Sequence, residues 1–272
     1  DVQFANGTYT KKENIIIPSH RLFEPEIFKN DKKIDEVVNL ISKAKKPIFY
    51  IGGGCINSGP KAAELVSELV ELTGAPATMT LMGLGVLGSS HPNSLGMLGM
   101  HGMYEANMAM HDCDVMINIG ARFDDRVTGR LDAFSPNSKK IHIDIDESNI
   151  NKTIKVDVPV VGDVTSVLKR VVKVWKDNNL KTNQSDLKLW WDKINNWKKI
   201  DCLHFTNNEK EIKPQYAIQR LYELTKDKKT FITTEVGQHQ MWAAQYYKFE
   251  KPNRWLTSGG LGTMGYGFPA AI

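Results

Sequence analysis

The most constraining feature of the sequence is a regular alternation of short apolar runs and helix-like segments between residues 46 and 178. A helix expected from Pro60 has apolar side chains at helical spacing, and Gly74 stands where glycine commonly ends a helix. Strands that alternate with helices predict an α/β fold with an open, Rossmann-like parallel sheet flanked by helices. The runs with the length of buried strands are residues 46–51, 75–81, 114–120, 140–146 and 156–161.

A second alternating unit follows a change of composition near residue 178. Residues 178–213 carry three tryptophans among many lysines and asparagines, which predicts an amphipathic helix and a linker without strands. Pro214 then opens a helix, and a further strand, helix and strand are expected before the glycine-rich end. The expected divisions are a linker (1–30), a central α/β domain (31–180), a linker with a helix (181–212) and the start of a second α/β domain (213–272).

Composition excludes several classes of protein. The 35 basic and 31 acidic residues leave a net charge of +4, which gives no case for nucleic-acid binding. The basic cluster between residues 29 and 46 is typical of a solvated helical face, with an anion-binding patch as the alternative. No run reaches the ~18 apolar residues of a membrane span. Three widely spaced cysteines indicate neither a disulfide framework nor a zinc site, and they suit a reducing compartment.

Both ends of the sequence predict an internal piece of a longer protein. The chain opens with Asp1 rather than Met and has no signal segment. It closes in an apolar run that ends at Ile272, whereas natural termini are usually polar.

Three glycine-rich segments could bring the backbone close to a phosphate. Gly52, Gly53 and Gly54 lie between a strand and a helix, which favours cofactor contact, with a tight packing turn as the alternative. Residues 83–88 and 260–265 both match the pattern G-x-G-x-x-G. No helix follows the first, which argues against a nicotinamide-binding turn, whereas the second does follow a strand.

Two loops carry side chains suited to a ligand. The Met/His loop, residues 98–102, places Met100 and His101 between glycines, so that it could lie over a flat ligand, although a lone histidine is usually structural. The Arg/Asp segment, residues 120–129, leaves the carboxyl end of a strand, where open α/β sheets bind ligands. One of its arginines could grip an anion bidentately, the alternative being a surface ion-pair network.

Two further segments place polar residues after strands. Asp144 could accept a hydrogen bond from a ribose or ribityl hydroxyl, or it could simply cap a loop. Residues 237–242 open a helix directly after a strand, which suits a diphosphate, with helix capping alone as the alternative.

Four strings together identify a family resemblance. They are LGMHG at residues 98–102, GARFDDRVTG at 120–129, GQHQMWAAQ at 237–245 and SGGLGTMGYGFPAAI at 258–272. They resemble the catalytic subunits of acetohydroxyacid synthases, also called acetolactate synthases, in the family's order. The resemblance implies a transferase that decarboxylates pyruvate on thiamine diphosphate and transfers the hydroxyethyl unit to a second 2-keto acid. It implies the products 2-acetolactate or 2-aceto-2-hydroxybutyrate, on the route to valine, leucine and isoleucine.

The resemblance also assigns site residues by matching position. Arg126 matches the arginine that binds the acceptor's carboxylate, and a planar guanidinium fits that role. Met264 matches the apolar wedge that bends thiamine diphosphate. The other thiamine diphosphate contacts are Gln238, His239, Gly262 and Thr263. The FAD contacts are Arg21, Gly53, Thr80, Leu81, Leu98, Gly99, Met100, His101, Gly120, Ala121, Arg122, Phe123, Asp124, Asp144, Ile145, Asp163 and Val164.

Two parts of the family's machinery are expected outside this sequence. The glutamate that activates thiamine belongs to the family's first domain, and the Gly-Asp-Gly…Asn motif that holds Mg²⁺ lies beyond Ile272. No metal ligand is therefore expected here, and the chain alone is expected to lack synthase activity. The resemblance implies a homodimer or larger assembly and a possible small regulatory subunit. It implies a bacterial cytoplasmic protein, and an organellar copy without its transit peptide would look the same.

Two other functions fit part of the pattern. A flavoprotein related to pyruvate oxidase would share the architecture, but oxidation needs no second keto-acid carboxylate and leaves Arg126 unused. A non-catalytic flavin-binding module would need only residues 30–180 and predicts no function for Gln238, His239 or Met264.

Overall fold

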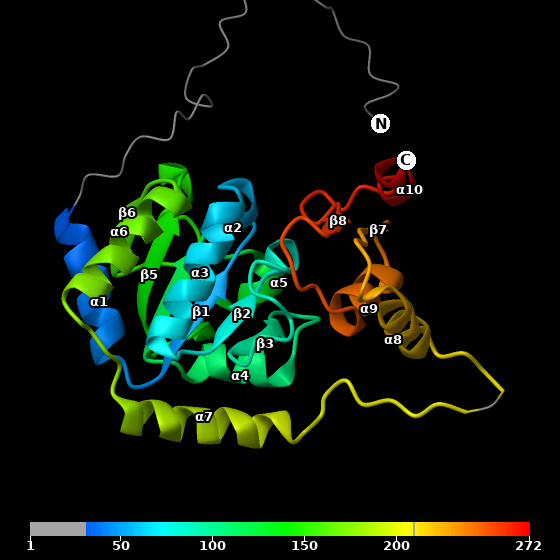
Figure 1. Cartoon of the computed structure of the whole chain (residues 1–272), viewed down its shortest axis with the longest axis horizontal. Coiled ribbons are helices and arrows are strands. Elements are labelled where there is room, and N and C mark those ends of the chain that lie inside the picture. The colour runs from blue at the N-terminus through cyan, green and yellow to red at the C-terminus, as the bar shows by residue number, and fades with distance from the viewer. Residues whose placement is uncertain (1–30, 209) are drawn as a thin grey trace, which may run out of the picture.

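The computed structural model describes residues 31–208 and 210–272, and its central feature is a six-stranded parallel sheet (Figure 1). The prediction for Arg21 and the expected linker at residues 1–30 lie outside the described residues. The strand order is β3-β2-β1-β4-β5-β6, which is the doubly wound order of Rossmann-like sheets. The strands are β1 (Pro47–Ile51), β2 (Ala77–Met79), β3 (Ser94–Met97), β4 (Val115–Ile119), β5 (Lys139–Asp144) and β6 (Val158–Val161). The predicted α/β fold is confirmed.

Helices cover both faces of this sheet. One apolar core is formed by side chains of α1, α3 and α6 together with side chains of the sheet such as Phe49 and Ile117. A second core lies on the other face, where α4 (Tyr104–Asp112) and a later helix, α7 (Gln184–Lys198), cover Ile48, Tyr50 and Met116. Such two-sided cover explains why β1 and β4 are buried at every position. The helices are α1 (Asp31–Lys43), α2 (Gly54–Asn57), α3 (Pro60–Thr73), α4 (Tyr104–Asp112), α5 (Asp125–Thr128) and α6 (Val164–Asp177), with short 3₁₀ turns η3 (Leu81–Gly83), η4 (Leu131–Ala133) and η5 (Glu147–Asn149).

The tryptophan-rich segment forms α7 (Gln184–Lys198), which lies along the lower edge of the central unit in Figure 1. The predicted amphipathic helix is confirmed. The Asn183 side chain caps it by accepting from the backbone N–H groups of Ser185 and Asp186. Trp190 is buried and donates from Nε1 to the carbonyl of Pro47 at 3.0 Å. The helix is therefore part of the second apolar core.

A smaller unit follows and is built around two parallel strands, with Ile232 opposite Trp255. Its elements are α8 (Pro214–Thr225), β7 (Ile232–Thr234), α9 (Gln238–Tyr246), β8 (Trp255–Thr257) and α10 (Gly267–Ala271). The predicted order of helix, strand, helix and strand is confirmed. The sequence predicts neither β3 nor α10. In β3 burial alternates over only four residues, one of them a glycine, and α10 is a five-residue helix that contains Pro269, so both are too short for a clear periodic signal. None of the described helices is long and apolar enough to cross a membrane.

Two glycines of residues 83–88, Gly85 and Gly88, lie at a junction between the two units, whereas Gly83 packs against Ile51 of the central sheet. The Gly85 backbone lies close to the connection between α9 and β8. A Cβ on Gly85 would stand 2.3 Å from the carbonyl oxygen of Lys251 in that connection. Ser89 and Phe249 exchange two hydrogen bonds beside it, at 3.0 and 2.9 Å. Glu250 accepts from the backbone and hydroxyl of Ser90. The pattern G-x-G-x-x-G therefore serves backbone packing here, which agrees with the prediction that it is no nicotinamide turn.

We expect Gly85→Ala to destabilise the folded chain more than Gly59→Ala does. Both glycines have a positive φ, of 88° and 97°, so an alanine strains the backbone at either position. Only at Gly85 does the added methyl also meet a backbone carbonyl, since a Cβ at Gly59 has nothing within 4 Å. Overpacking of this kind costs about 1–3 kcal/mol. Urea denaturation measures the difference, and equal losses for the two variants would contradict the close approach at Gly85.

Candidate functional site

The carboxyl ends of the six parallel strands carry the predicted flavin contacts that the structure describes. Parallel strands end at one edge of a sheet, so these segments lie on the same side of the central unit. Gly53 follows β1, and Thr80 and Leu81 follow β2. The Met/His loop follows β3, and residues 120–124 follow β4. Asp144 ends β5 and Ile145 follows it, and Asp163 and Val164 follow β6.

The strand order reverses between β1 and β4. At this reversal, glycines allow the backbone after β1 to lie directly against the backbone after β4. The Gly54 N–H donates to the carbonyl of Gly120 at 2.9 Å. A Cβ on Gly52 would stand 2.2 Å from the same oxygen. The packing role of Gly52 and Gly54, the alternative in the sequence analysis, is therefore confirmed. Gly53 is half-buried between them and faces Met82. Ligands of open α/β sheets bind at this kind of reversal.

Two buried polar residues hold the start of the Arg/Asp segment. Asn118 accepts from the N–H of Ala121 at 3.0 Å and donates to its carbonyl at 2.8 Å. His142 donates from Nε2 to the same carbonyl at 2.9 Å. The sequence analysis missed both residues. The available signal was a polar side chain inside an otherwise apolar strand, because such a group is buried only with a partner.

The side chains of this segment point in two directions. Phe123 has a φ of 56° and is buried, with its ring 5.1 Å from the His142 ring and 5.7 Å from the Tyr50 ring. Arg122 is exposed, and its guanidinium lies 3.6 Å from the carboxylate of Asp124. Burial of Tyr50, followed by the charge of Asp124, raises the pKa of its hydroxyl well above the ordinary value. Because the Phe123 ring is buried, the contacts that Phe123 can make with a ligand come from its backbone.

Arg126 lies where the Arg/Asp segment meets the Met/His loop. Asp124 caps α5 by accepting from the Arg126 N–H at 3.1 Å, and the Arg126 carbonyl accepts from the Met100 N–H at 2.8 Å. The Arg126 side chain is 71% exposed, and among residues 31–208 and 210–272 its one ion pair, with Asp125, is long at 3.9 Å. A hollow of about 430 Å³ lies beside it, lined by the Met/His loop, α4 and α5. The guanidinium is thus available to an anion.

The Met/His loop is fixed by Asn107 of α4. The Asn107 amide accepts from the Gly99 N–H at 2.8 Å and donates to the Gly99 carbonyl at 2.9 Å. The Leu98 side chain is buried, whereas Met100 is largely exposed and His101 is half-buried. The loop therefore presents Met100 outward from a fixed backbone.

Asp144 and Asp163 both have structural partners. Asp144 is buried and accepts from the N–H of Asp146 at 2.8 Å, which is the loop-capping role left open above. Asp163 caps α6 by accepting from the Ser166 N–H, and its other oxygen accepts from the Ser58 hydroxyl at 2.6 Å. Neighbouring Val164 is buried, while Ile145 is exposed.

In the smaller unit, the amino end of α9 is open to an anion. No side chain caps this nine-residue helix, and its first turn contains no acidic residue. Gln238 and His239 are exposed there. The first backbone N–H groups of a helix have no partner within it, and the helix dipole favours negative charge at this end. These donors fit a diphosphate.

The last turn, residues 258–265, presents apolar side chains next to that helix end. Met264 is 80% exposed, and Gly262 lies within reach of Val236. Gly259 packs against Met82 so closely that a Cβ would stand 2.3 Å from its sulfur. The turn therefore meets the residues that follow β2, and the two predicted cofactor segments lie side by side.

Glu235 supports the last turn, and the sequence analysis missed it. Its carboxylate accepts from the N–H groups of Tyr266, Gly267 and Phe268 at 2.8–3.2 Å. Desolvation acts to raise its pKa, but these backbone donors together hold the pKa of the carboxyl below its ordinary value. The signal was an acid at the end of a strand and just before Gly237.

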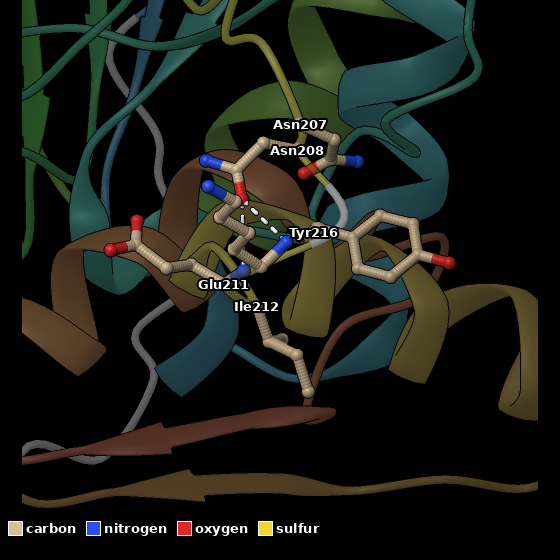
Figure 2. A pocket seen from close by; sticks show the side chains of 6 residues that line it. Asn207, Asn208, Glu211, Ile212 and Tyr216 are labelled. Atoms are coloured by element: carbon tan, nitrogen blue, oxygen red, sulfur yellow. Dashed lines mark hydrogen bonds between the residues drawn. The ribbon is translucent and has the colours of Figure 1, made fainter.

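A separate hollow lies at the loop that precedes α8 and at the first turn of α8, and its lining contains none of the predicted site residues. Figure 2 shows Asn207, Asn208, Glu211, Ile212 and Tyr216 around it. The Asn208 side chain accepts from the N–H groups of Lys210 and Glu211, so it organises a local turn.

Comparison with known families agrees with this arrangement. Residues 34–171, half of the chain, match the family described as "Thiamine pyrophosphate enzyme, central domain". Residues 235–272 match "Thiamine pyrophosphate enzyme, C-terminal TPP binding domain".

Several curated proteins are similar over nearly the whole chain. The "Acetolactate synthase large subunit" of Buchnera aphidicola subsp. Schizaphis graminum is 46% identical over 97% of this chain and 46% of its own length. The "Acetolactate synthase isozyme 3 large subunit" of Escherichia coli K12 is 43% identical over 93% of this chain and 44% of its own length. The "Acetolactate synthase, chloroplastic" of Arabidopsis thaliana is 48% identical over 89% of this chain and 35% of its own length. The chain spans about half the length of the bacterial relatives that it matches. It therefore belongs to the thiamine pyrophosphate enzyme family and is homologous to the large subunits of acetolactate synthase.

Proposed function

We propose that the chain forms the flavin-binding centre and part of the thiamine diphosphate site of a carboligase. The complete protein decarboxylates pyruvate and joins the hydroxyethyl unit to a second 2-keto acid, giving 2-acetolactate or 2-aceto-2-hydroxybutyrate for branched-chain amino acid synthesis. The proposal is supported most by one contact, between Gly259 of the last turn and Met82 after β2. This contact brings the thiamine segment to the flavin edge of the sheet, which a flavin-binding module alone would not need.

Thiamine diphosphate would be held by the smaller unit. The open amino end of α9, at Gln238 and His239, supplies backbone N–H groups for the diphosphate. Gly262, Thr263 and Met264 supply a turn whose exposed apolar side chain would pack on the rings. The bound cofactor acts as the electron sink that makes decarboxylation of a 2-keto acid possible.

FAD would lie across the carboxyl edge of the central sheet. The half-buried Gly53, the exposed Arg122, Met100 and Ile145, and the backbone of residues 120–124 present the groups that it would touch. Asn118 and His142 orient the backbone of residues 120–124. Arg126 would hold the carboxylate of the acceptor keto acid, because its guanidinium is a planar double donor without a close partner.

The remaining parts of the proposal concern the complete protein. Its Mg²⁺ ligands and its activating glutamate would come from segments outside residues 1–272. The boundaries expected from the sequence, with the central unit at 31–180 and the thiamine unit from 213, are retained. A homodimer or larger assembly, a small regulatory subunit and a location in the bacterial cytoplasm complete the proposal, with an organellar copy as the alternative location.

The test is acetolactate formation by the full-length protein that contains this chain. We expect product from pyruvate only when thiamine diphosphate, FAD and Mg²⁺ are all present. Omission of one cofactor at a time, after its removal by dialysis or gel filtration, measures each requirement. Release of peroxide instead of acetolactate would replace the proposal with the oxidase. Binding of flavin without any effect of thiamine diphosphate would leave only the flavin module.

A further inference from the structure

One side chain of the thiamine unit contacts the Met/His loop directly. Gln245 lies at the end of α9 opposite to the proposed diphosphate site. Its Nε2 donates to the carbonyl of His101 at 2.8 Å, across 144 residues of sequence. The amide is partly buried, so the hydrogen bond is shielded from full competition with water.

Further contacts keep α9 fixed beside this loop. Ala243 and Ala244 are buried in the same apolar core as Leu87 and Met97 of the central unit. Near the helix end, Tyr246 donates from its hydroxyl to the carbonyl of Leu203 at 3.0 Å. The helix therefore cannot move away from the loop without exposing core side chains.

The loop in turn connects to Arg126. The Met100 N–H, one residue before His101, donates to the Arg126 carbonyl at 2.8 Å. The Gly99 backbone is bound on both sides by Asn107. A continuous series of hydrogen bonds and short backbone steps thus runs from α9 through the Met/His loop to α5. One end carries the proposed diphosphate site, and the other carries the proposed acceptor site.

We propose that Gln245 is a positioning residue that couples the thiamine diphosphate and flavin sites. Its hydrogen bond holds the His101 carbonyl, and with it the flavin-facing loop, in one place relative to α9. A ligand that orders one side lowers the cost of ordering the other, so each cofactor tightens the binding of the other by the same factor. This inference rests on the proposed function, because it needs both cofactors to bind.

A donor series at position 245 tests the inference in the full-length protein. The measured quantity is a coupling factor, the Kd for thiamine diphosphate without FAD divided by the Kd with saturating FAD, by calorimetry. Gln245→Met keeps the side-chain length but removes the donor, and Gln245→Glu places an acceptor against the carbonyl. We expect both to lower the coupling factor by about two- to tenfold, the size of one neutral hydrogen bond. Gln245→Lys, which restores an N–H donor, is expected to recover at least part of it.

The controls separate this inference from a packing role and from the proposed function. Gln219→Met makes the same change at an exposed position of α8 and is expected to leave the coupling factor unchanged. The inference would be overturned if the coupling factor of the unsubstituted protein were one. It would also be overturned if the Met, Glu and Lys variants kept the coupling factor of the unsubstituted protein. The proposed function would stand in both cases. Failure of the unsubstituted protein to bind either cofactor would overturn both.

Discussion

Arg126→Ala in the full-length protein will slow carboligation by about 10- to 100-fold and leave the decarboxylation of pyruvate near its starting rate. The guanidinium is exposed, lies beside the hollow next to the Met/His loop and has only a long ion pair. Hydrogen bonds to a charged group contribute about 1.5–3 kcal/mol, which at about 1.4 kcal/mol per factor of ten gives this range. The effect falls on the acceptor step because only that step uses the second carboxylate. Parallel assays of carbon dioxide and acetolactate measure the two rates.

Arg130→Ala is the matched control for this substitution. Arg130 stands four residues further on, its side chain is 79% exposed, and its guanidinium is already bound bidentately to Asp132 at 2.7 and 2.9 Å. We expect little change in either rate, because this arginine has no free face for a ligand carboxylate. Equal loss of decarboxylation and carboligation in Arg126→Ala would assign Arg126 a general structural role and remove it from the acceptor site.

Trp190→Ala will lower the free energy of unfolding by about 3–5 kcal/mol, the usual range for a large aromatic side chain removed from a core. Trp190 is 1% exposed, packs edge-on against Trp197 and donates to the Pro47 carbonyl. Its removal leaves both a cavity and an unpaired carbonyl at the start of β1. Urea denaturation followed by circular dichroism measures the loss.

Leu189→Ala on the same helix is the comparison. The Leu189 side chain is 67% exposed, so its truncation removes little buried area, and we expect a change within about 0.5 kcal/mol. A loss in Trp190→Ala no larger than that in Leu189→Ala would show that α7 contributes little to the stability of the central unit.

The parts of the fold that the sequence predicts are those with a local signal. Strand β1 is a continuous apolar run, and β4 is one apart from Asn118. Strand β5 alternates polar and apolar residues from Lys140 on, and α3 has helical spacing between Pro60 and Gly74. Strand β3 has no such run, because Gly96 interrupts it and one face is only half-covered. The glycines of residues 83–88 match a nucleotide-binding pattern by residue type, yet each is packed against a residue distant in sequence: Gly83 against Ile51, Gly85 against Lys251 and Gly88 against Glu250.

The same distinction applies to the candidate site. Residues that follow a strand, such as those of the Arg/Asp segment, can be found because the end of the strand fixes where they lie. Asn118, His142, Glu235 and Gln245 could not be assigned a role from the sequence. His142, Glu235 and Gln245 each act through a partner that is distant in sequence, and these pairings exist only in the folded chain. Asn118 bonds to Ala121 three residues on, but this contact depends on the bend of the backbone after β4, which the sequence pattern does not show.

Helix α7 is anchored at the amino edge of the central sheet, whereas the proposed flavin contacts lie at its carboxyl edge. The indole groups of Trp190 and Trp191 in α7 donate to the carbonyls of Pro47 and Gly74. These carbonyls lie at the amino edge of the sheet, opposite to the proposed flavin segments that the structure describes. Randomised libraries at Arg122, Met100 or Ile145 therefore leave these anchoring bonds intact. Selection can sample these three exposed positions of the carboxyl edge, provided that α7 keeps its tryptophans and the buried Asn118 and His142 are left in place.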